Sequence, residues 1–162
     1  MRQTIAACVV GVLAGLCTVA ARSPLSNPVQ ESKPVRLGNF SVSLAVKDLA
    51  ASKAFYEKLG FKAVMGNGKT WQILQNDSST IGLFHGVVKQ NSLTYNPGWD
   101  RSCNTLPDFD DVRDLQKTFK ERGIAFTTEA DASSTGPASF VVVDPDGNPI
   151  FVDQHVPRPG KK

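Results

Sequence analysis

The segment from about residue 40 to residue 155 carries a weak internal repeat. Val46-Lys47-Asp48-Leu49 aligns with Phe109-Asp110-Asp111-Val112 at an offset of 63 residues. Without a gap, the same alignment places Gly60 on Gly123. A fixed offset indicates that one structural unit occurs twice, so we expect two copies of a small fold packed together.

Each copy is predicted to contain a strand, a helix and three further strands. Ser41 to Val46 alternates polar and apolar residues, which predicts a strand. Asp48 and Asp111 are suited to cap the following helices, and Gly60 and Gly123 to end them. The later strands are expected near residues 62–65, 70–75, 80–85, 125–128, 139–143 and 149–154. A unit of roughly 50 residues is too small to be stable alone, so two βαβββ units should form one α+β domain.

Three segments of the 162-residue chain lie outside the predicted domain, residues 38–156, whose units are about 38–86 and 103–156. Residues 1–21 have an early Arg, an apolar run and small residues at the end, which predicts a signal peptide removed on export. The protein would then be periplasmic or secreted. An uncleaved membrane anchor is the alternative. Residues 22–37 contain three prolines and read as a flexible tether, and residues 157–162 as a disordered tail.

Composition narrows the chemistry. Lys plus Arg is 18 against 15 Asp plus Glu, and no basic stripe is present, so nucleic-acid binding is not expected. Membrane contact would come only through an uncleaved signal. Signal removal would leave Cys103 as the single cysteine, which excludes an internal disulfide. Cys103 is expected to be a small buried residue rather than a nucleophile.

Two stretches of sequence resemble a known superfamily. Phe-Ser-Val-Ser-Leu-Ala-Val-Lys-Asp-Leu opens the first unit at residue 40, and Val-Asp-Pro-Asp-Gly-Asn-Pro-Ile begins at residue 143. Both resemble the vicinal oxygen chelate superfamily, which includes glyoxalases, bleomycin resistance proteins and extradiol dioxygenases. The resemblance implies that the two sheets curl into a cup. In many members this cup holds a divalent metal on His, Gln or Glu; other members bind drugs without catalysis.

The resemblance also implies where metal ligands would lie. The corresponding residues are Ser41, Asn104, Phe151, and Leu83 or Gly82. None of them offers an imidazole, carboxylate or thiolate, the groups that zinc, nickel, iron or manganese require. We therefore expect no metal at these positions and no cofactor.

A displaced metal site is the first alternative. Strand alternation places Leu83 with His85, and Phe151 with Asp153 and His155. If Phe151 faces the cup, then His85, Asp153 and His155 would supply two imidazoles and a carboxylate for a lyase or dioxygenase. The competing interpretation is that His85 donates hydrogen bonds in a pocket and His155 lies at a frayed strand end.

The leading hypothesis is a metal-free site for a small organic ligand. Ser41 and Ser43 would face the cup, as would Asn104, Leu106 and Asp108 of the second unit, giving a small polar floor. Phe151, Leu83 and either Trp71 or Trp99 would form apolar walls, and Trp99 could instead plug the junction of the units. The predicted ligand-binding residues are Ser41, Ser43, His85, Trp99, Asn104, Phe151 and Asp153.

No catalytic residue is assigned, and His85 is the expected general acid or base if the protein is an enzyme. The last alternative is a non-catalytic module whose cup is filled by its own side chains or by a partner. A homodimer is the expected assembly, both for such a module and for the metal-free ligand-binding protein.

Overall fold

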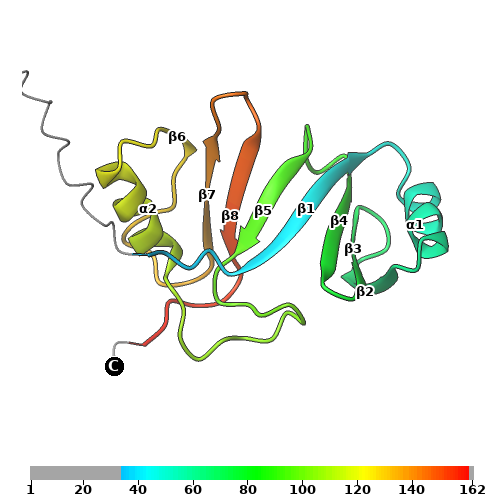
Figure 1. Cartoon of the computed structure of the whole chain (residues 1–162), viewed down its shortest axis with the longest axis horizontal. Helices are drawn as coiled ribbons and strands as arrows, with labels where there is room; N and C mark the ends of the chain where they lie inside the picture. The colour runs from blue at the N-terminus through cyan, green and yellow to red at the C-terminus, as the bar shows by residue number, and fades with distance from the viewer. Residues whose placement is uncertain (1–33, 161–162) are drawn as a thin grey trace, which may run out of the picture. The chain divides into compact units, whose positions relative to one another are not determined.

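The structure is a computed structural model and describes residues 34–160 (Figure 1). The predicted signal peptide and most of the predicted tether lie outside the described residues. The first unit consists of β1 (Asn39–Val46), α1 (Leu49–Lys58), β2 (Lys62–Gly66), β3 (Trp71–Asn76) and β4 (Ser79–His85). The second consists of β5 (Ser92–Asn96), α2 (Val112–Glu121), β6 (Phe126–Thr128), β7 (Ala138–Val143) and β8 (Pro149–Gln154). The predicted α+β fold of two βαβββ units is confirmed.

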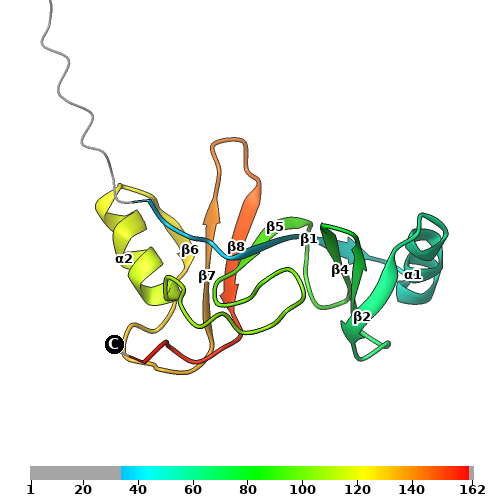
Figure 2. The same cartoon turned by 60° about the horizontal axis from the view of Figure 1, so that its bottom comes forward.

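The eight strands form one curved, open sheet in the order β2-β3-β4-β1-β5-β8-β7-β6 (Figures 1 and 2). The two units meet where β1 pairs antiparallel with β5. Within the units, β1 pairs parallel with β4, and β5 pairs parallel with β8. The first strand of each unit therefore lies at the centre of the sheet, and the residues of β1 and β5 form its middle.

Both helices begin at the predicted caps. The Asp48 carboxylate accepts a hydrogen bond from the Ala51 amide at 2.9 Å, and the Asp111 carboxylate accepts one from the Arg113 amide at 3.0 Å. These bonds satisfy amides that have no partner within a helix. Gly60 and Gly123 follow the helices with φ angles of 91° and 78°, values that glycine adopts without steric cost.

The strand that opens the second unit lies earlier than expected. The gapless alignment predicted a strand through Asn104 and Asp108, whereas β5 ends at Asn96 and is followed by a long loop. In the first unit only Lys47 separates the strand from the capping Asp48, but residues 97–110 separate β5 from Asp111. We call residues 97–110 the connector. The alignment was wrong here because it was anchored on the helix caps and allowed no insertion before them.

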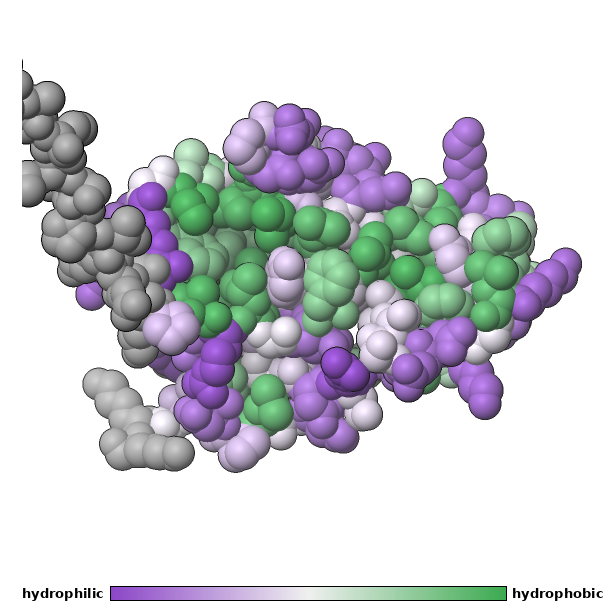
Figure 3. All heavy atoms as spheres, in the orientation of Figure 1, coloured by the Kyte–Doolittle hydropathy of each residue, from purple (hydrophilic) through white to green (hydrophobic). Residues whose placement is uncertain are grey.

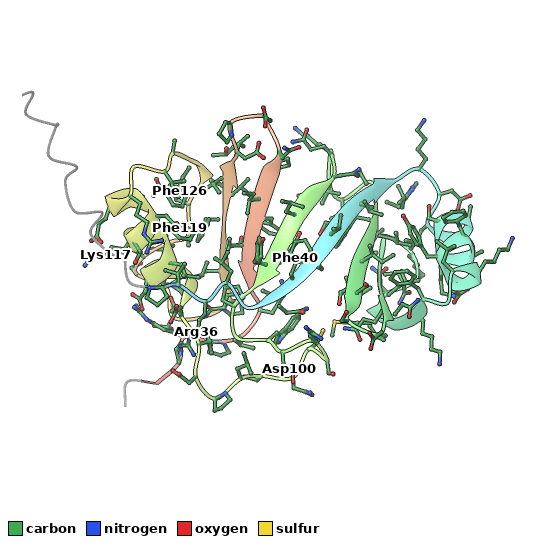
Figure 4. All side chains as sticks on the ribbon, viewed as in Figure 1. Arg36, Phe40, Asp100, Lys117, Phe119 and Phe126 are labelled. Carbon is green, nitrogen blue, oxygen red and sulfur yellow. The ribbon has the colours of Figure 1, made fainter. Side chains whose placement is uncertain are left out.

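The apolar core is divided between the units, and the second part is the larger. In the second unit, Phe140 is fully buried, and its ring makes edge-on contacts with Phe119 of α2 and Phe126 of β6. Phe119 and Phe126 are labelled in Figure 4. In the first unit, the buried cluster contains Leu49, Leu74, Ile81 and Leu83. Leu49 is the only buried residue of α1, so α1 is held to the sheet more weakly than α2, which buries five residues.

The chain segments that flank the domain are attached to it. Val35 and Leu37 pack against the core of the second unit, and Arg36 pairs with Asp108 and Asp110 at 3.1 Å each. Arg158 donates its amide to the Thr135 carbonyl and pairs with Asp114 at 2.7 Å. The predictions of a flexible tether at residues 34–37 and of a disordered tail at Arg158 were therefore wrong. Short sequence windows contain no sign of these contacts, because the partners lie far away along the chain.

The sheet face that carries the helices remains partly apolar on its surface. Phe40 and Leu93 are exposed there, beside the half-buried Val42 and Tyr95. In the space-filling view, apolar side chains form a band between α2 and α1 (Figure 3). Over residues 34–160, neither helix is long and apolar enough to cross a membrane.

Candidate functional site

The face of the sheet opposite the helices has a polar centre. Strand alternation turns Val42, Leu44 and Val46 of β1 toward the cluster under α1, and therefore turns Ser41 and Ser43 the other way. We call this opposite face the inner face. Five small or medium polar side chains of β1 and β5 are buried on it, each at most 9 % exposed. They are Asn39, Ser41, Ser43, Thr94 and Asn96, and they are called the floor below.

Side-chain hydrogen bonds between neighbouring strands fix the positions of several floor residues. The hydroxyls of Ser43 and Thr94 lie 2.8 Å apart, and Ser92 adds a hydroxyl 3.4 Å from that of Thr94. Asn96 donates its side-chain amide to the Asp153 carbonyl at 3.0 Å, which links β5 to β8. Hydroxyls both donate and accept, so the floor offers directional contacts to a polar group placed on it.

Large side chains flank the floor on both sides. On the first unit, Phe84 and Ile73 lie over Gly82, where an added β-carbon would come within 2.5 Å of the Phe84 ring. On the second unit, Phe151 lies beside Thr94 in the parallel pair of β8 with β5. These side chains are half-buried while the smaller ones between them are buried. The floor is therefore a strip of polar side chains flanked in the sheet by larger apolar ones, a combination typical of small-molecule sites.

Trp99 and His155 form one edge of the inner face. Their rings stack with centroids 4.3 Å apart and an interplanar angle of 13°. His155 Nε2 also lies 3.1 Å from Asp153 Oδ2. His155 follows Phe151 and Asp153 at two-residue spacing, the signal by which the sequence placed all three on one face. The expectation that His155 lies at a frayed strand end was incomplete, because its ring stacks on Trp99 and its Nε2 atom pairs with the Asp153 carboxylate.

The connector reaches across the inner face from the second unit to the first. Its Trp99 contacts His155 after β8, while the Arg101 carbonyl accepts a hydrogen bond from the Gln75 side chain of β3. Figures 1 and 2 show the connector crossing one end of the central strands. The tip is a closed turn in which Asp100 accepts from the Ser102 and Asn104 amides at 2.8 and 2.9 Å. The hydrogen bonds from Asn104 and Ser102 lower the pKa of Asp100.

Three sequence-based placements were wrong. Asn104 is an exposed residue of the connector tip whose side chain binds Asp100 at 3.1 Å, and it does not belong to the floor. Leu83 is fully buried under α1 rather than forming a wall of the cup. His85 pairs with Val46 and alternates with Leu83, so it belongs to the helix side of the sheet. The first error follows from the missing insertion and the other two from the wrong register of β4.

The remaining predicted residues do lie together or beside one another. Ser41 and Ser43 are in the floor, Phe151 is in a wall, and Trp99 and Asp153 are at the edge. Thr94 was missed, and it lies in the strand that the alignment overlooked. Burial raises the pKa of the Cys103 thiol, with Asp100 adding to the effect. A raised pKa reduces the thiolate fraction, in keeping with a non-catalytic cysteine.

The inner face does not suit the metal that the superfamily often binds. The floor presents neutral hydroxyls and amides, and beside it lies the phenyl ring of Phe151, the residue to which the resemblance assigned the usual carboxylate ligand. Divalent transition metals require imidazole, thiolate or carboxylate ligands. Among residues 34–160, no three His, Cys, Asp or Glu side chains gather closely enough to hold an ion. The alternative of a displaced site on His85, Asp153 and His155 is therefore not assembled by the fold.

Comparisons with known proteins agree with this architecture. The family model described as "Glyoxalase/Bleomycin resistance protein/Dioxygenase superfamily" matches residues 40–152. No curated protein sequence matches the chain.

Three solved structures are similar in fold. One is described as an NAD-dependent benzaldehyde dehydrogenase from Legionella pneumophila (17% identity, TM-score 0.55, covering 72% of this chain and 98% of that one). The second is a superfamily member from Vibrio splendidus 12B01 (16% identity, TM-score 0.51, covering 72% and 97%). The third is an extradiol ring-cleaving dioxygenase from Brevibacterium fuscum (20% identity, TM-score 0.50, covering 80% of this chain and 36% of that one). At these identities the likeness concerns the fold alone.

The family match covers both units, from Phe40 in β1 to Val152 in β8. It includes the two motifs on which the resemblance was based. The chain belongs to the glyoxalase/bleomycin resistance protein/dioxygenase superfamily.

Proposed function

We propose that this protein binds a small organic ligand on its inner face without the superfamily's usual metal. The observation that carries the proposal is the buried polar floor between the apolar walls of Phe84 and Phe151. Phe151 replaces a metal ligand with a surface on which an aromatic ring can pack, and the hydroxyls of Ser43 and Thr94 supply directional contacts. A binding role needs no nucleophile or metal, in keeping with the neutral residues of the floor.

The neutral aromatic probe 2-naphthylmethanol tests this proposal. Replacing Phe151 by alanine is expected to weaken its binding about three- to tenfold, because a ring contact contributes about 0.5–1.5 kcal/mol. Isothermal titration calorimetry on the purified protein measures the effect. Phe55→Ala is the matched control, since Phe55 is 58% exposed on α1 and away from the inner face. Equal affinities for both variants would refute the assignment, and melting curves exclude unfolding as the cause.

Export and the metal-free state are part of the same proposal. The apolar segment at residues 4–21 supports a signal peptide, and the chemistry of the floor supports the absence of a bound metal. Mass spectrometry of exported protein with a new terminus near residue 22 would test cleavage. Elemental analysis is expected to find much less than one metal ion per chain; a stoichiometric ion would revive the lyase or dioxygenase alternative.

We also propose a homodimer, supported by the apolar surface on the helix side. Phe40 is 45% and Leu93 36% exposed, and contiguous apolar surface is common at protein interfaces. Light scattering after size exclusion is expected to give twice the mass of one chain. The variant Phe40→Lys should shift the mass toward the monomer, whereas Val64→Lys, on the exposed edge strand β2, should not.

A further inference from the structure

The six strands that form the inner face carry almost no charge. Strands β3, β4, β1, β5, β8 and β7 contain no Lys and no Arg, and Asp153 is their only Asp or Glu. Asp153 shares the inner face with Phe151 by alternation, and its side chain is 25% exposed. Over these six strands the inner face therefore presents one carboxylate and no Lys or Arg; the nearest lysine of the sheet, Lys62, lies on the edge strand β2, where it pairs with Gln75.

Charged groups at the edge of the inner face do not make its charge positive. The connector has a single cation, Arg101, beside Asp100, and Asp108 and Asp110 pair with Arg36. Arg101 is exposed, and the contact that it makes with β3 comes from its carbonyl rather than from its guanidinium. The side chain of His155 is 44% exposed, and its Nε2 atom lies 3.1 Å from the Asp153 carboxylate. A ligand anion on the floor would thus leave water without a Lys or Arg partner on the floor strands or their neighbours, which is unfavourable.

The walls and the edge favour flat, apolar rings. Trp71 pairs with Phe84, Ile73 pairs with Gly82 beside the Phe84 ring, and Phe151 faces them across the floor. At the edge, Trp99 already stacks on the imidazole of His155. Aromatic faces attract rings and organic cations, whereas their negative quadrupole repels anions.

We propose that the inner face selects a planar aromatic ligand without negative charge, with an amine on the ligand lying next to Asp153. This inference rests on the proposed binding role and adds the charge class of the ligand. It predicts that ligands bearing carboxylate or phosphate groups are poor partners of this protein. The floor hydroxyls would hold a neutral polar group of the ligand, and Asp153 its cationic group.

Three probes with the same ring separate the charge classes: 2-naphthylmethylamine, 2-naphthylmethanol and 2-naphthoate. Titrated calorimetrically into the purified protein at pH 7 and low salt, the amine is expected to bind about fivefold more tightly than the alcohol. The carboxylate should bind more weakly than the alcohol by a similar factor. The expected ratio is modest because Asp153 is partly exposed and its field is screened by water and salt.

Asp153→Asn should reduce the ratio of amine to alcohol affinity to about one. Asp77→Asn is the control, because it changes the net charge equally from the turn between β3 and β4. Tight binding of 2-naphthoate, or an amine preference that survives in Asp153→Asn, would overturn the charge assignment while leaving the binding role intact. If none of the three probes binds, the binding role and this inference both fail.

Discussion

Replacing Arg113 by methionine is expected to lower the free energy of unfolding by about 3–5 kcal/mol, the usual cost of breaking a buried ion pair. The Arg113 guanidinium lies 3.1 Å from both carboxylate oxygens of Asp111, and the two side chains are only 2% and 1% exposed. It also donates to the Ser134 hydroxyl at 2.7 Å and the Gly136 carbonyl at 2.6 Å. The variant therefore leaves the buried Asp111 carboxylate without the Arg113 cation, with hydrogen bonds only from Gln154 and the backbone amide of residue 113, and it leaves the Ser134 and Gly136 acceptors without their donor. Urea or thermal unfolding followed by circular dichroism measures the loss.

Arg36→Met is the matched control. Arg36 also pairs with two aspartates, but its side chain is 55% exposed, and exposed pairs contribute at most about 1 kcal/mol. Equal losses from the two arginines would show that the Asp111 pair is not the buried network described.

Acid pH provides a second check on the Arg113 prediction. Burial alone would raise the pKa of Asp111, but hydrogen bonds from Gln154 and Arg113 together with the charge of Arg113 lower it. A carboxylate whose pKa is lower when folded stabilises the fold above its unfolded pKa of about 3.9, and this contribution is lost as the pH falls. The difference between wild type and Arg113→Met should therefore be largest near neutral pH and shrink below about pH 4. A difference that grows in acid would contradict the mechanism.

Replacing Phe140 by alanine is also expected to have a large effect, lowering the free energy of unfolding by about 3–5 kcal/mol. Phe140 is fully buried, and the rings of Phe119 and Phe126 lie against it at 5.9 and 5.1 Å between centroids. Truncation removes the apolar contact and leaves a cavity that α2 and the sheet cannot fill without moving. The loss should appear in the free energy of unfolding from denaturant titration.

Phe55→Ala serves as the comparison, because Phe55 is 58% exposed and its removal opens no cavity. Its expected effect is within about 0.5 kcal/mol, as for most surface substitutions. If Phe140→Ala were as mild as Phe55→Ala, the second-unit core would have to be more adaptable than its burial indicates. Because α1 buries only Leu49, substitutions on the helices should in general cost more on α2 than on α1.

The fold could be predicted from the sequence because its signals are local. Asp48 and Asp111 cap their helices by accepting hydrogen bonds from amides of the first turn, and Gly60 and Gly123 follow the helix ends. In the turn before β8, the Asp144 carboxylate accepts a hydrogen bond from the Asp146 amide. Such features depend only on neighbours within a few residues, so the same short signals can be recognised in both units of the chain. The motif before β8 likewise placed Phe151 on the inner face.

The errors came from contacts between distant residues. The repeat signal before the second helix is confined to Phe109–Val112, so a gapless alignment moved the opening strand of the second unit onto the connector and assigned Asn104 to the floor. Thr94 was overlooked for the same reason. Leu83 and His85 were placed on the wrong face because a shift of one residue in the register of β4 exchanges its two faces. The side-chain pairs of Arg36 with Asp110 and of Arg158 with Asp114 join residues more than 40 positions apart.

The sequence by itself determined two βαβββ units and their helix caps, because these depend on the identity and spacing of nearby residues. The pairing of β1 with β5, the path of the connector and the side of the sheet on which each polar residue lies were decided only by the tertiary structure. Pairing depends on which surfaces bury together, and that is a property of the whole chain. It is this pairing that brings Ser43 within 2.8 Å of Thr94 and forms the floor of the candidate site.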